Sequence, residues 1–319
     1  MKSDRKKLCV VAPAYNEGDG IENFCASLKS ILETVESKYE WSLIIVIDPS
    51  QDDTEQVVRD LAHADARVSA LVMSRRVGHQ ASLMAGMDQC RADACITMDA
   101  DLQHPPELIP EMLALFETGA DVVQAVRVST DGVGTLNASL SKAFYKLINR
   151  ASDIELIESG ADFRLLSKRV LTVFQTELRE RNPFLRGLVQ WIGYPTQTLQ
   201  FVAPARHSGQ SKYSMRAKGR LALSGLVYFS NTPLKIGLIA GASIAVFAAV
   251  IGILSIVPIL LGDSTPPGWT TLAVLMAFLS SAQLLSIGLL GIYIGAIFDE
   301  VKQRPAYLIR EKIGFSAEE

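Results

Sequence analysis

The fold of this chain of 319 residues depends on the stretch ACITMDADLQHPPEL, residues 94–108. The first five residues are apolar enough for a buried strand, and the two prolines predict that a helix begins at Pro106. Between these elements Asp99 and Asp101 stand two positions apart in a turn, where they can converge with the Gln103 amide. Carboxylate and amide oxygens are the ligands that Mg²⁺ and Mn²⁺ prefer. The stretch therefore predicts a strand that ends in a divalent-cation site suited to a diphosphate.

On either side of this stretch, apolar strands alternate with helical segments. Apolar strands in strict β/α alternation are typical of a mainly parallel sheet with both faces covered. The fold class predicted for residues 1–215 is therefore α/β, with a Rossmann-like sheet. The expected strands span residues 8–12, 42–47, 68–73, 94–98 and 122–126, and the expected helices span 20–35, 54–62, 80–90 and 106–116.

Polar clusters follow three of these strands. Because ligands bind at the carboxyl ends of parallel strands, we expect the clusters to open onto one edge of the sheet. Tyr15 and Asp48 could hold a nucleobase and its imino proton, with Glu17 toward the base or ribose. Turn formation alone would explain each cluster singly, since Pro, Asn, Asp and Ser favour turns. Their coincidence favours a nucleotide site made of residues 13–17, 48–53 and 99–101.

Neither of the two familiar phosphate loops is present. The chain has no G-x-x-x-x-G-K-[ST] sequence, and no G-x-G-x-x-G follows the first strand. A diphosphate would then be held by the metal and by basic side chains, which form charge-assisted hydrogen bonds. The basic loop 206–213 could equally be an anchor for anionic lipid headgroups, and the two roles are compatible. The phosphate-binding candidates are Arg127, Arg164, Arg206, Ser211 and Lys212.

The apolar excess is concentrated near the C-terminal end. Residues 236–261 and 270–298 contain no charged side chain, and each stretch exceeds the roughly 20 residues that cross a bilayer. Two buried core helices are the alternative, but soluble helices rarely run so long without a charge. We predict two transmembrane helices within 233–298, preceded by an interfacial amphipathic helix over 216–232.

The flanks of this hairpin predict its orientation. Basic residues lie on both sides of it, whereas the connecting loop 262–269 has none. By the positive-inside rule the chain is a multi-pass protein of the inner (plasma) membrane, with residues 1–215, the tail 299–319 and both termini in the cytoplasm. Small residues along the spans could pack helices between chains, so a homo-oligomer is a further expectation.

The sequence supports neither a cysteine-based metal site nor a nucleic-acid-binding surface. The four cysteines, Cys9, Cys25, Cys90 and Cys95, show no metal-ligand spacing and are expected to be reduced packing residues. No basic stripe interleaved with aromatic residues indicates nucleic acid as a partner.

Together these motifs resemble a known family. The pattern is similar to the polyprenyl-phosphate glycosyltransferases, the dolichol-phosphate mannose synthase and bactoprenol glucosyltransferase group with the GT-A fold in glycosyltransferase family 2. The resemblance covers nearly the whole chain, and its most specific parts are the acidic run and the Ser-Lys-Tyr loop. It rests on PAYNE (13–17), DADLQHPPE (99–107), ADFRLL (161–166), RGL (186–188) and SKY (211–213), and continues through 229–234, 293–295 and 300–305.

The resemblance implies roles for individual residues. Asp99, Asp101 and Gln103 match the positions that hold the metal and the donor diphosphate, and Asp162 lies in a motif near the reacting centre. The catalytic residues would be Asp101, Asp162 and Arg127. Nucleotide-binding positions correspond to Pro13, Tyr15, Glu17, Asp48 and Asp99, and positions for the donor and acceptor phosphates correspond to Arg127, Arg164, Arg206, Ser211 and Lys212.

The chain departs from the family pattern at two places. The usual Asp-Asp-Gly-Ser-x-Asp turn is here IDPSQD, residues 47–52, which bears on base recognition. Ala161 replaces a glycine before Asp162, which could crowd the backbone near the acceptor.

The resemblance implies inverting transfer of a sugar from a nucleotide-sugar to undecaprenyl or another polyprenyl phosphate, with Mg²⁺ or Mn²⁺ as cofactor. UDP-glucose is the favoured donor because of the two spans; GDP-mannose or a modified pentose are alternatives. A processive polysaccharide synthase is disfavoured because Gln190 and Trp191 are adjacent, without the Gln-x-x-Arg-Trp motif. A non-catalytic membrane adaptor is the alternative from another class, as is a transporter, which two spans could form only as an oligomer.

Overall fold

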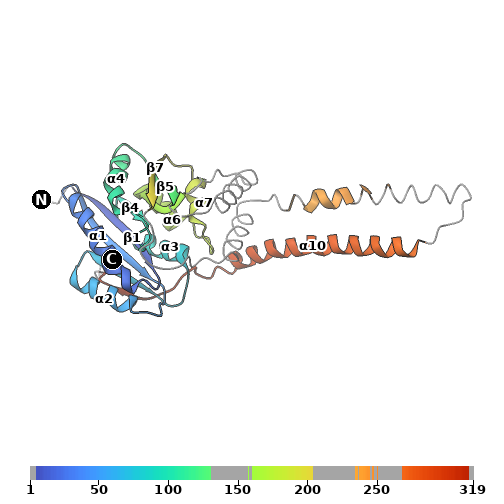
Figure 1. The fold of residues 1–319 in the computed structure, drawn as a ribbon, viewed down its shortest axis with the longest axis horizontal. Coiled ribbons are helices and arrows are strands. Elements are labelled where there is room, and N and C mark those ends of the chain that lie inside the picture. Colours follow the sequence, from blue (N-terminus) through green and yellow to red (C-terminus); the bar gives the residue numbers. More distant parts are fainter. Residues whose placement is uncertain are drawn as a thin grey trace, which may run out of the picture. The chain divides into compact units, whose positions relative to one another are not determined.

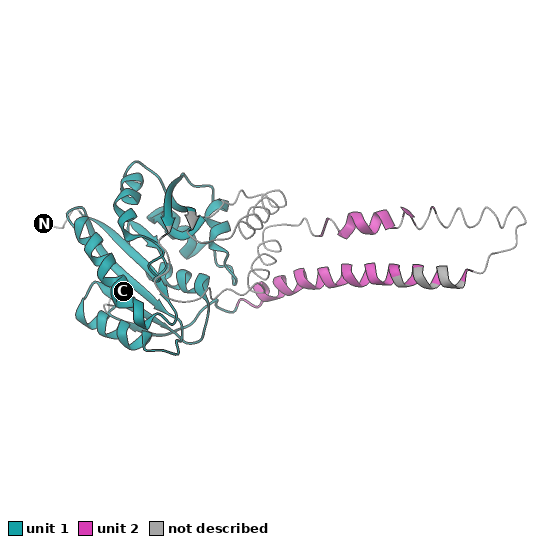
Figure 2. Cartoon of the chain, in the orientation of Figure 1, with its two compact units in different colours: residues 1–146, 154–215, 304–319 teal, residues 147–153, 216–303 magenta. Residues whose placement is uncertain are grey.

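The computed structural model describes residues 5–130, 157, 160–203, 234–235, 237–244, 246–247, 250 and 268–315 (Figure 1). The chain divides into two compact units (Figure 2). One comprises Met1–Lys146, Ile154–Met215 and Arg304–Glu319, and the other comprises Leu147–Asp153 and Arg216–Gln303. The C-terminal segment after the long apolar helix therefore groups with the N-terminal sheet.

Every strand and helix predicted over residues 8–126 is present, with its ends shifted by at most a few residues. The predicted helix over 106–116 begins as a short 3-10 turn, η1. The elements of this part are β1 (Lys6–Ala14), α1 (Gly18–Thr34), β2 (Tyr39–Ile47), α2 (Thr54–Ala64), β3 (Val68–Met73), α3 (His79–Gln89), β4 (Ala94–Thr97), η1 (Pro106–Leu108), α4 (Ile109–Glu117) and β5 (Val122–Thr130).

Further elements follow that the apolar pattern did not predict. They are β6 (Gly160–Ser167), α6 (Lys168–Thr176), α7 (Leu185–Trp191), β7 (Thr196–Ala203) and, after the apolar helix α10 (Trp269–Val301), β8 (Ile309–Ile313). The tail predicted as a cytosolic extension thus contributes a strand.

One sheet runs through this unit in the order β7-β5-β6-β4-β1-β2-β3-β8. Its centre is parallel, as predicted: β1 pairs with both β2 and β4, and β2 pairs with β3. Two strands are antiparallel to this centre. β6 lies between β4 and β5, and β8 covers the free edge of β3. The sheet is therefore mixed, because these two strands return from distant parts of the sequence.

Helices cover both faces of the sheet, which explains why its strands are apolar throughout. Leu8, Val10 and Ala12 of β1 are fully buried in the core formed with α1, α2 and α4. The intervening Cys9 and Val11 are equally buried but point to the other face, since side chains alternate along a strand. There α3 contacts β1, β2 and α6.

Gly86 sets the distance between α3 and the sheet. A Cβ atom at this position would stand 2.2 Å from Cγ1 of Val11 and 3.1 Å from Cγ2 of Val46. We expect Gly86→Ala to lower the free energy of unfolding by about 1–3 kcal/mol, because valine side chains in a packed core cannot move aside freely. Thermal unfolding of the full chain in detergent measures this effect.

Gly20 in α1 is the matched control. A Cβ there meets no atom within 4 Å, so Gly20→Ala should stabilise the chain by about 0.4–1 kcal/mol. Equal effects of the two substitutions would contradict close packing at Gly86.

The second unit contains the apolar helix α10. Within the part of the chain that the structure describes, one helix is long and apolar enough to cross a membrane, over Phe278–Val301. Large apolar side chains such as Leu284, Leu285 and Ile294 are exposed on it. Residues 237–244, in the first predicted span, are helical. The rest of that span lies largely outside the described residues, as does the interfacial segment 216–232, so the two-span hairpin stays a prediction.

Candidate functional site

The predicted polar clusters do meet at one edge of the sheet. Parallel register pairs Ala14 of β1 with Ile47 of β2, and Val11 with Thr97 of β4. The residues that follow these strands therefore share the carboxyl edge. The antiparallel β6 brings Asp162 and Arg164 to the same edge. Thr97 of β4 pairs with Arg164, and the Thr97 hydroxyl donates to the Asp162 carbonyl at 2.8 Å.

The acidic turn after β4 is held by its own side chains. The backbone N–H of Gln103 donates to Oδ1 of Asp101 at 3.1 Å. Leu102 between them has φ of 59°, in the left-handed region that non-glycine residues avoid. Backbone strain of this kind is typical of functional sites, where surrounding contacts fix the conformation. The turn leaves Asp101 exposed and Gln103 buried.

His104 fixes the backbone at the first carboxylate. Its Nδ1 accepts the Asp99 N–H at 2.9 Å, which places the proton of the neutral ring on Nε2, 3.7 Å from Oδ2 of Asp99. The ring is 2% exposed and stacks on Phe163 with centroids 5.4 Å apart. Burial lowers the pKa of His104, against the raising effect of nearby carboxylates. A neutral imidazole is therefore part of the framework of the turn.

Asp162 is the centre of a buried ionic cluster. Its carboxylate accepts from Nη2 of Arg164 at 2.6 Å and from Nη2 of Arg186 on α7 at 2.8 Å. Gln80 donates to it at 3.4 Å. Burial alone would raise the pKa of Asp162, but Arg186, His79 and Arg164 outweigh that effect and hold the pKa well below its usual range. Asp162 is thus a fixed anion and a poor proton acceptor at neutral pH.

His79, at the start of α3, connects this cluster to the acidic turn. Its Nε2 lies 3.3 Å from Oδ1 of Asp99 and 3.3 Å from Oδ2 of Asp162. Burial would lower the pKa of His79, yet the two carboxylates raise it overall. The imidazole therefore stands between two anions that would otherwise repel each other.

Arg164, beside Asp162, is fully buried. It is 1% exposed, and its Nε and Nη1 have no hydrogen-bond partner among the described residues. Buried guanidinium donors without a partner are costly unless a ligand satisfies them. This arrangement suits an anionic ligand such as a phosphate.

Asp48 holds the loop between β3 and α3. Its two oxygens accept the N–H groups of Val77 at 3.1 Å and Gly78 at 2.9 Å, and the side chain is 4% exposed. In the same loop the Arg76 guanidinium lies 3.9 Å above the Tyr15 ring. The structure thus gives Asp48 a structural role in the loop, and its predicted contact with a base stays a prediction.

The remaining predicted residues fall into two groups. Arg127 of β5 reaches Gln103, with Nη2 3.5 Å from Oε1, and joins the acidic turn. Pro13, the residue before the end of β1, is half-buried. The Glu17 N–H, just before α1, donates to the Thr54 hydroxyl at 2.9 Å. Three predicted phosphate-binding residues lie outside the described residues: Arg206, Ser211 and Lys212.

The acidic turn fits a divalent cation. Oδ1 of Asp99 is buried and accepts no hydrogen bond within residues 5–130 and the other described ranges, although His79 is its ionic neighbour. No group of three His, Cys, Asp or Glu side chains forms a complete cage within those ranges. An ion held here would therefore share its ligands with a diphosphate, which is how Mg²⁺ is commonly bound.

Comparison with known proteins shows which family the chain belongs to. Residues 9–174 match the family model described as Glycosyl transferase family 2. The chain belongs to this family. That match runs from β1 into α6 and so includes the acidic turn, His79, Asp162 and Arg164, but not Arg186, on the α/β fold that the sequence resemblance implied.

Two relatives extend the similarity beyond the family 2 domain. "Uncharacterized glycosyltransferase YkcC" of Bacillus subtilis (strain 168) is 35% identical over 305 residues, 96% of this chain and 94% of the relative. "SfII prophage-derived bactoprenol glucosyl transferase" of Shigella flexneri is 36% identical over 305 residues, 96% and 98% of the two chains. Among solved structures, glucosyl-3-phosphoglycerate synthase from Mycobacterium tuberculosis with Mn²⁺, UDP and phosphoglyceric acid aligns with a TM-score of 0.48, 18% identity, and coverage of 70% and 76%.

Some residues of this family 2 site were missed by sequence reasoning. Sequence reasoning gave His79 and His104 no role, yet His79 lies between Asp99 and Asp162, and His104 is buried in the acidic turn. Arg186 was part of a motif without a role, and Gln80 was not singled out. The available signal was that His79 and Gln80 follow the third strand, at the same edge as the acidic turn.

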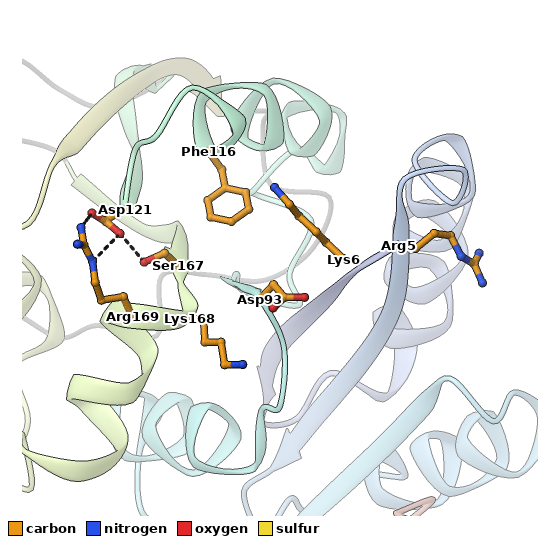
Figure 3. Close-up of a pocket in the computed structure, with 8 residues that line it drawn as sticks. All are labelled: Arg5, Lys6, Asp93, Phe116, Asp121, Ser167, Lys168 and Arg169. Atoms are coloured by element: carbon orange, nitrogen blue, oxygen red, sulfur yellow. Dashed lines mark hydrogen bonds and ion pairs between the residues drawn. The ribbon is translucent and has the colours of Figure 1, made fainter. Parts of the chain in front are cut away.

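A separate pocket of about 460 Å³ lies at the opposite edge of the sheet, at the amino ends of β1, β4 and β5 (Figure 3). Asp121 there accepts from the Ser167 hydroxyl at 2.8 Å and is paired with Arg169. Its place at the amino ends of these strands separates the pocket from the candidate site at the carboxyl edge of the sheet. The pocket is lined by Arg5, Lys6, Asp93, Phe116, Asp121, Ser167, Lys168 and Arg169.

Proposed function

We propose that this chain transfers a sugar, with inversion, from a nucleotide-sugar donor to polyprenyl phosphate, with UDP-glucose as the first-choice donor. The observation that carries the proposal is the buried Oδ1 of Asp99, which accepts no hydrogen bond among the described residues and has His79 as its ionic neighbour, in a turn that also exposes Asp101 at the carboxyl edge of the sheet. Relatives over nearly the full length, named bactoprenol glucosyl transferases, support glucose as the transferred sugar and a polyprenyl acceptor.

The donor diphosphate would be held by the acidic turn and by arginines. Asp99, Asp101 and Gln103 would bind Mg²⁺ or Mn²⁺, which when present stabilises the negative charge of the departing nucleoside diphosphate. The unpartnered Nε and Nη1 of the buried Arg164 are suited to the same negative charge. Arg127, Arg206, Ser211 and Lys212 are the further candidates for the two phosphates.

The acceptor needs little activation. A phosphate monoester oxygen is already ionised near neutral pH, so no strong general base is required. The low pKa of Asp162 agrees with this, because a carboxylate so held by Arg164 and Arg186 would orient the sugar or acceptor rather than take its proton.

The proposed setting is the cytoplasmic face of the plasma membrane. We propose that α10 and the segment 236–261 form the two-span hairpin, and that both termini are cytoplasmic. The apolar, exposed surface of Phe278–Val301 supports a membrane location for α10.

The test is transfer from radiolabelled UDP- and GDP-sugars to undecaprenyl phosphate, with the full chain in detergent. We expect organic-extractable label from UDP-glucose with Mg²⁺ or Mn²⁺, and loss of label with EDTA that excess metal restores. Label from GDP-mannose alone would contradict UDP-glucose as the donor, but it would still support sugar transfer to polyprenyl phosphate.

The adaptor alternative is tested in the same assay. Nucleotide binding without transfer from any donor, by a folded chain, would contradict the enzymatic proposal. Label retained unchanged in EDTA would contradict the metal site at the acidic turn.

A further inference from the structure

Residues 304–308 follow α10 in the chain and lie against the loop between β3 and α3. We call them the C-terminal brace. The Ser74 N–H donates to the Leu308 carbonyl at 2.8 Å, which continues the antiparallel pairing of β3 and β8 beyond the end of β3. Nη2 of Arg75 donates to the Ala306 carbonyl at 3.3 Å. The brace thus contacts the first two residues of the loop.

A side-chain anchor fixes the other side of the brace. The half-buried Tyr307 hydroxyl donates to Oδ2 of Asp88 near the end of α3, and Nη1 of Arg179 donates to the second oxygen of Asp88 at 2.7 Å. Nη1 of Arg181 donates to the Arg304 carbonyl at 2.8 Å. The brace is therefore attached both to the loop and to the helix that the loop enters.

The loop held in this way carries part of the candidate donor site. The guanidinium of Arg76 covers the Tyr15 ring, and the N–H groups of Val77 and Gly78 bind both oxygens of Asp48. Gly78 has φ of 86°, a conformation that glycine adopts freely, and His79 follows it at the start of α3. Displacement of this loop would move the contacts of Tyr15, Asp48 and His79 together.

We propose that the C-terminal brace positions the β3–α3 loop for binding the nucleoside diphosphate part of the donor. Residues 304–308 are positioning residues in this proposal, since they act through the loop and not on the substrate. The inference rests on the proposed function for the identity of the ligand, but the contacts that carry it belong wholly to the unit that contains the sheet.

The test is Tyr307→Phe in the full chain, which removes the hydroxyl bound to Asp88 and keeps the ring. Loss of a hydrogen bond to a charged group should raise the Kd for UDP about three- to tenfold, and the KM for donor with it, while kcat at saturating donor changes by less than about twofold. Hydrogen exchange of residues 74–78 should rise in the same variant.

Asp88→Asn weakens the same anchor from the other partner and should give the same pattern. The two substitutions together should have less than the sum of their separate effects, because both act on the Tyr307–Asp88 hydrogen bond, although Asp88→Asn also weakens the pair with Arg179. The matched control is Glu311→Gln on β8, which breaks an ion pair with Arg59 of α2 and leaves the loop contacts in place. It should change neither the Kd for UDP nor exchange at 74–78.

Three results would overturn the inference: unchanged exchange at 74–78 in both anchor variants, faster exchange with an unchanged Kd for UDP, or an equal rise in Kd for Glu311→Gln. A wild-type chain that binds neither UDP nor GDP would instead contradict the proposed function. The exchange measurement needs no ligand, so the two failures are read separately.

Discussion

Asp101→Asn is expected to lower sugar transfer about a hundred- to a thousandfold while the chain stays folded. The substitution removes a charged ligand from the proposed metal site, and loss of such a ligand should cost several kcal/mol of transition-state stabilisation. Asp101 is exposed, and its one described hydrogen bond, from the Gln103 N–H, can be accepted by an Asn oxygen. Initial rates with saturating donor and metal measure the effect, and the melting temperature checks folding.

Glu107→Gln is the matched control for Asp101→Asn. Glu107 lies in the same acidic run, is exposed, and stands on η1 outside the turn. Transfer by this variant should stay within about twofold of the wild type, since exposed substitutions away from a site have small effects. Asp101→Asn that keeps more than about a tenth of the activity would contradict the metal site.

Asp162→Asn is expected to affect both activity and stability. It leaves the buried guanidinium of Arg164 without its neighbouring counter-charge, and breaking a buried ion pair from one side costs about 3–5 kcal/mol. For a chain of this size the melting temperature should fall by on the order of 10 °C. Displacement of Arg164, Arg186 and His79 should lower kcat about a hundredfold, since small errors of position are costly in catalysis.

Asp121→Asn separates the two effects of Asp162→Asn. Asp121 is also buried and paired with an arginine, but it lies at the opposite edge of the sheet. Because the side chain of Arg169 is 64% exposed, we expect about 1 kcal/mol of lost stability and no change in kcat. A fall in kcat equal to that of Asp162→Asn would contradict a specific role for Asp162 in the site, because Asp121 lies at the opposite edge of the sheet and its loss costs less stability.

Local sequence patterns were sufficient to predict the strands at the centre of the sheet. The apolar runs of β1, β2, β3 and β4 are each followed by turn residues and then a helical segment, so neighbours in sequence determine the structure. β6 and β8 could not be predicted in this way. Their residues are partly charged, as in IREKI of β8, and they become strands only because distant edges offer hydrogen-bond partners.

In the candidate site too, the features that depend on neighbouring residues could be predicted, and those that depend on distant contacts could not. The turn after β4 could be predicted because Asp99, Asp101 and Gln103 are close in sequence, and the structure has a turn there in which the Gln103 backbone N–H donates to Asp101. A metal site in this turn stays a prediction. The ionic cluster around Asp162 joins residues from α3, β6 and α7. No spacing in the sequence predicts that His79 stands between Asp99 and Asp162, since that position depends on how α3 packs against the sheet.

The α/β order of the elements, the acidic turn and the apolar C-terminal stretches follow from hydrophobicity, turn preference and charge over a few neighbouring residues. Three features depend on tertiary contacts instead: β6 returns antiparallel, two arginines hold Asp162, and the chain after α10 contacts the β3–α3 loop. Such contacts join residues tens to hundreds of positions apart. They form only when burial of the whole core fixes the relative positions of the elements.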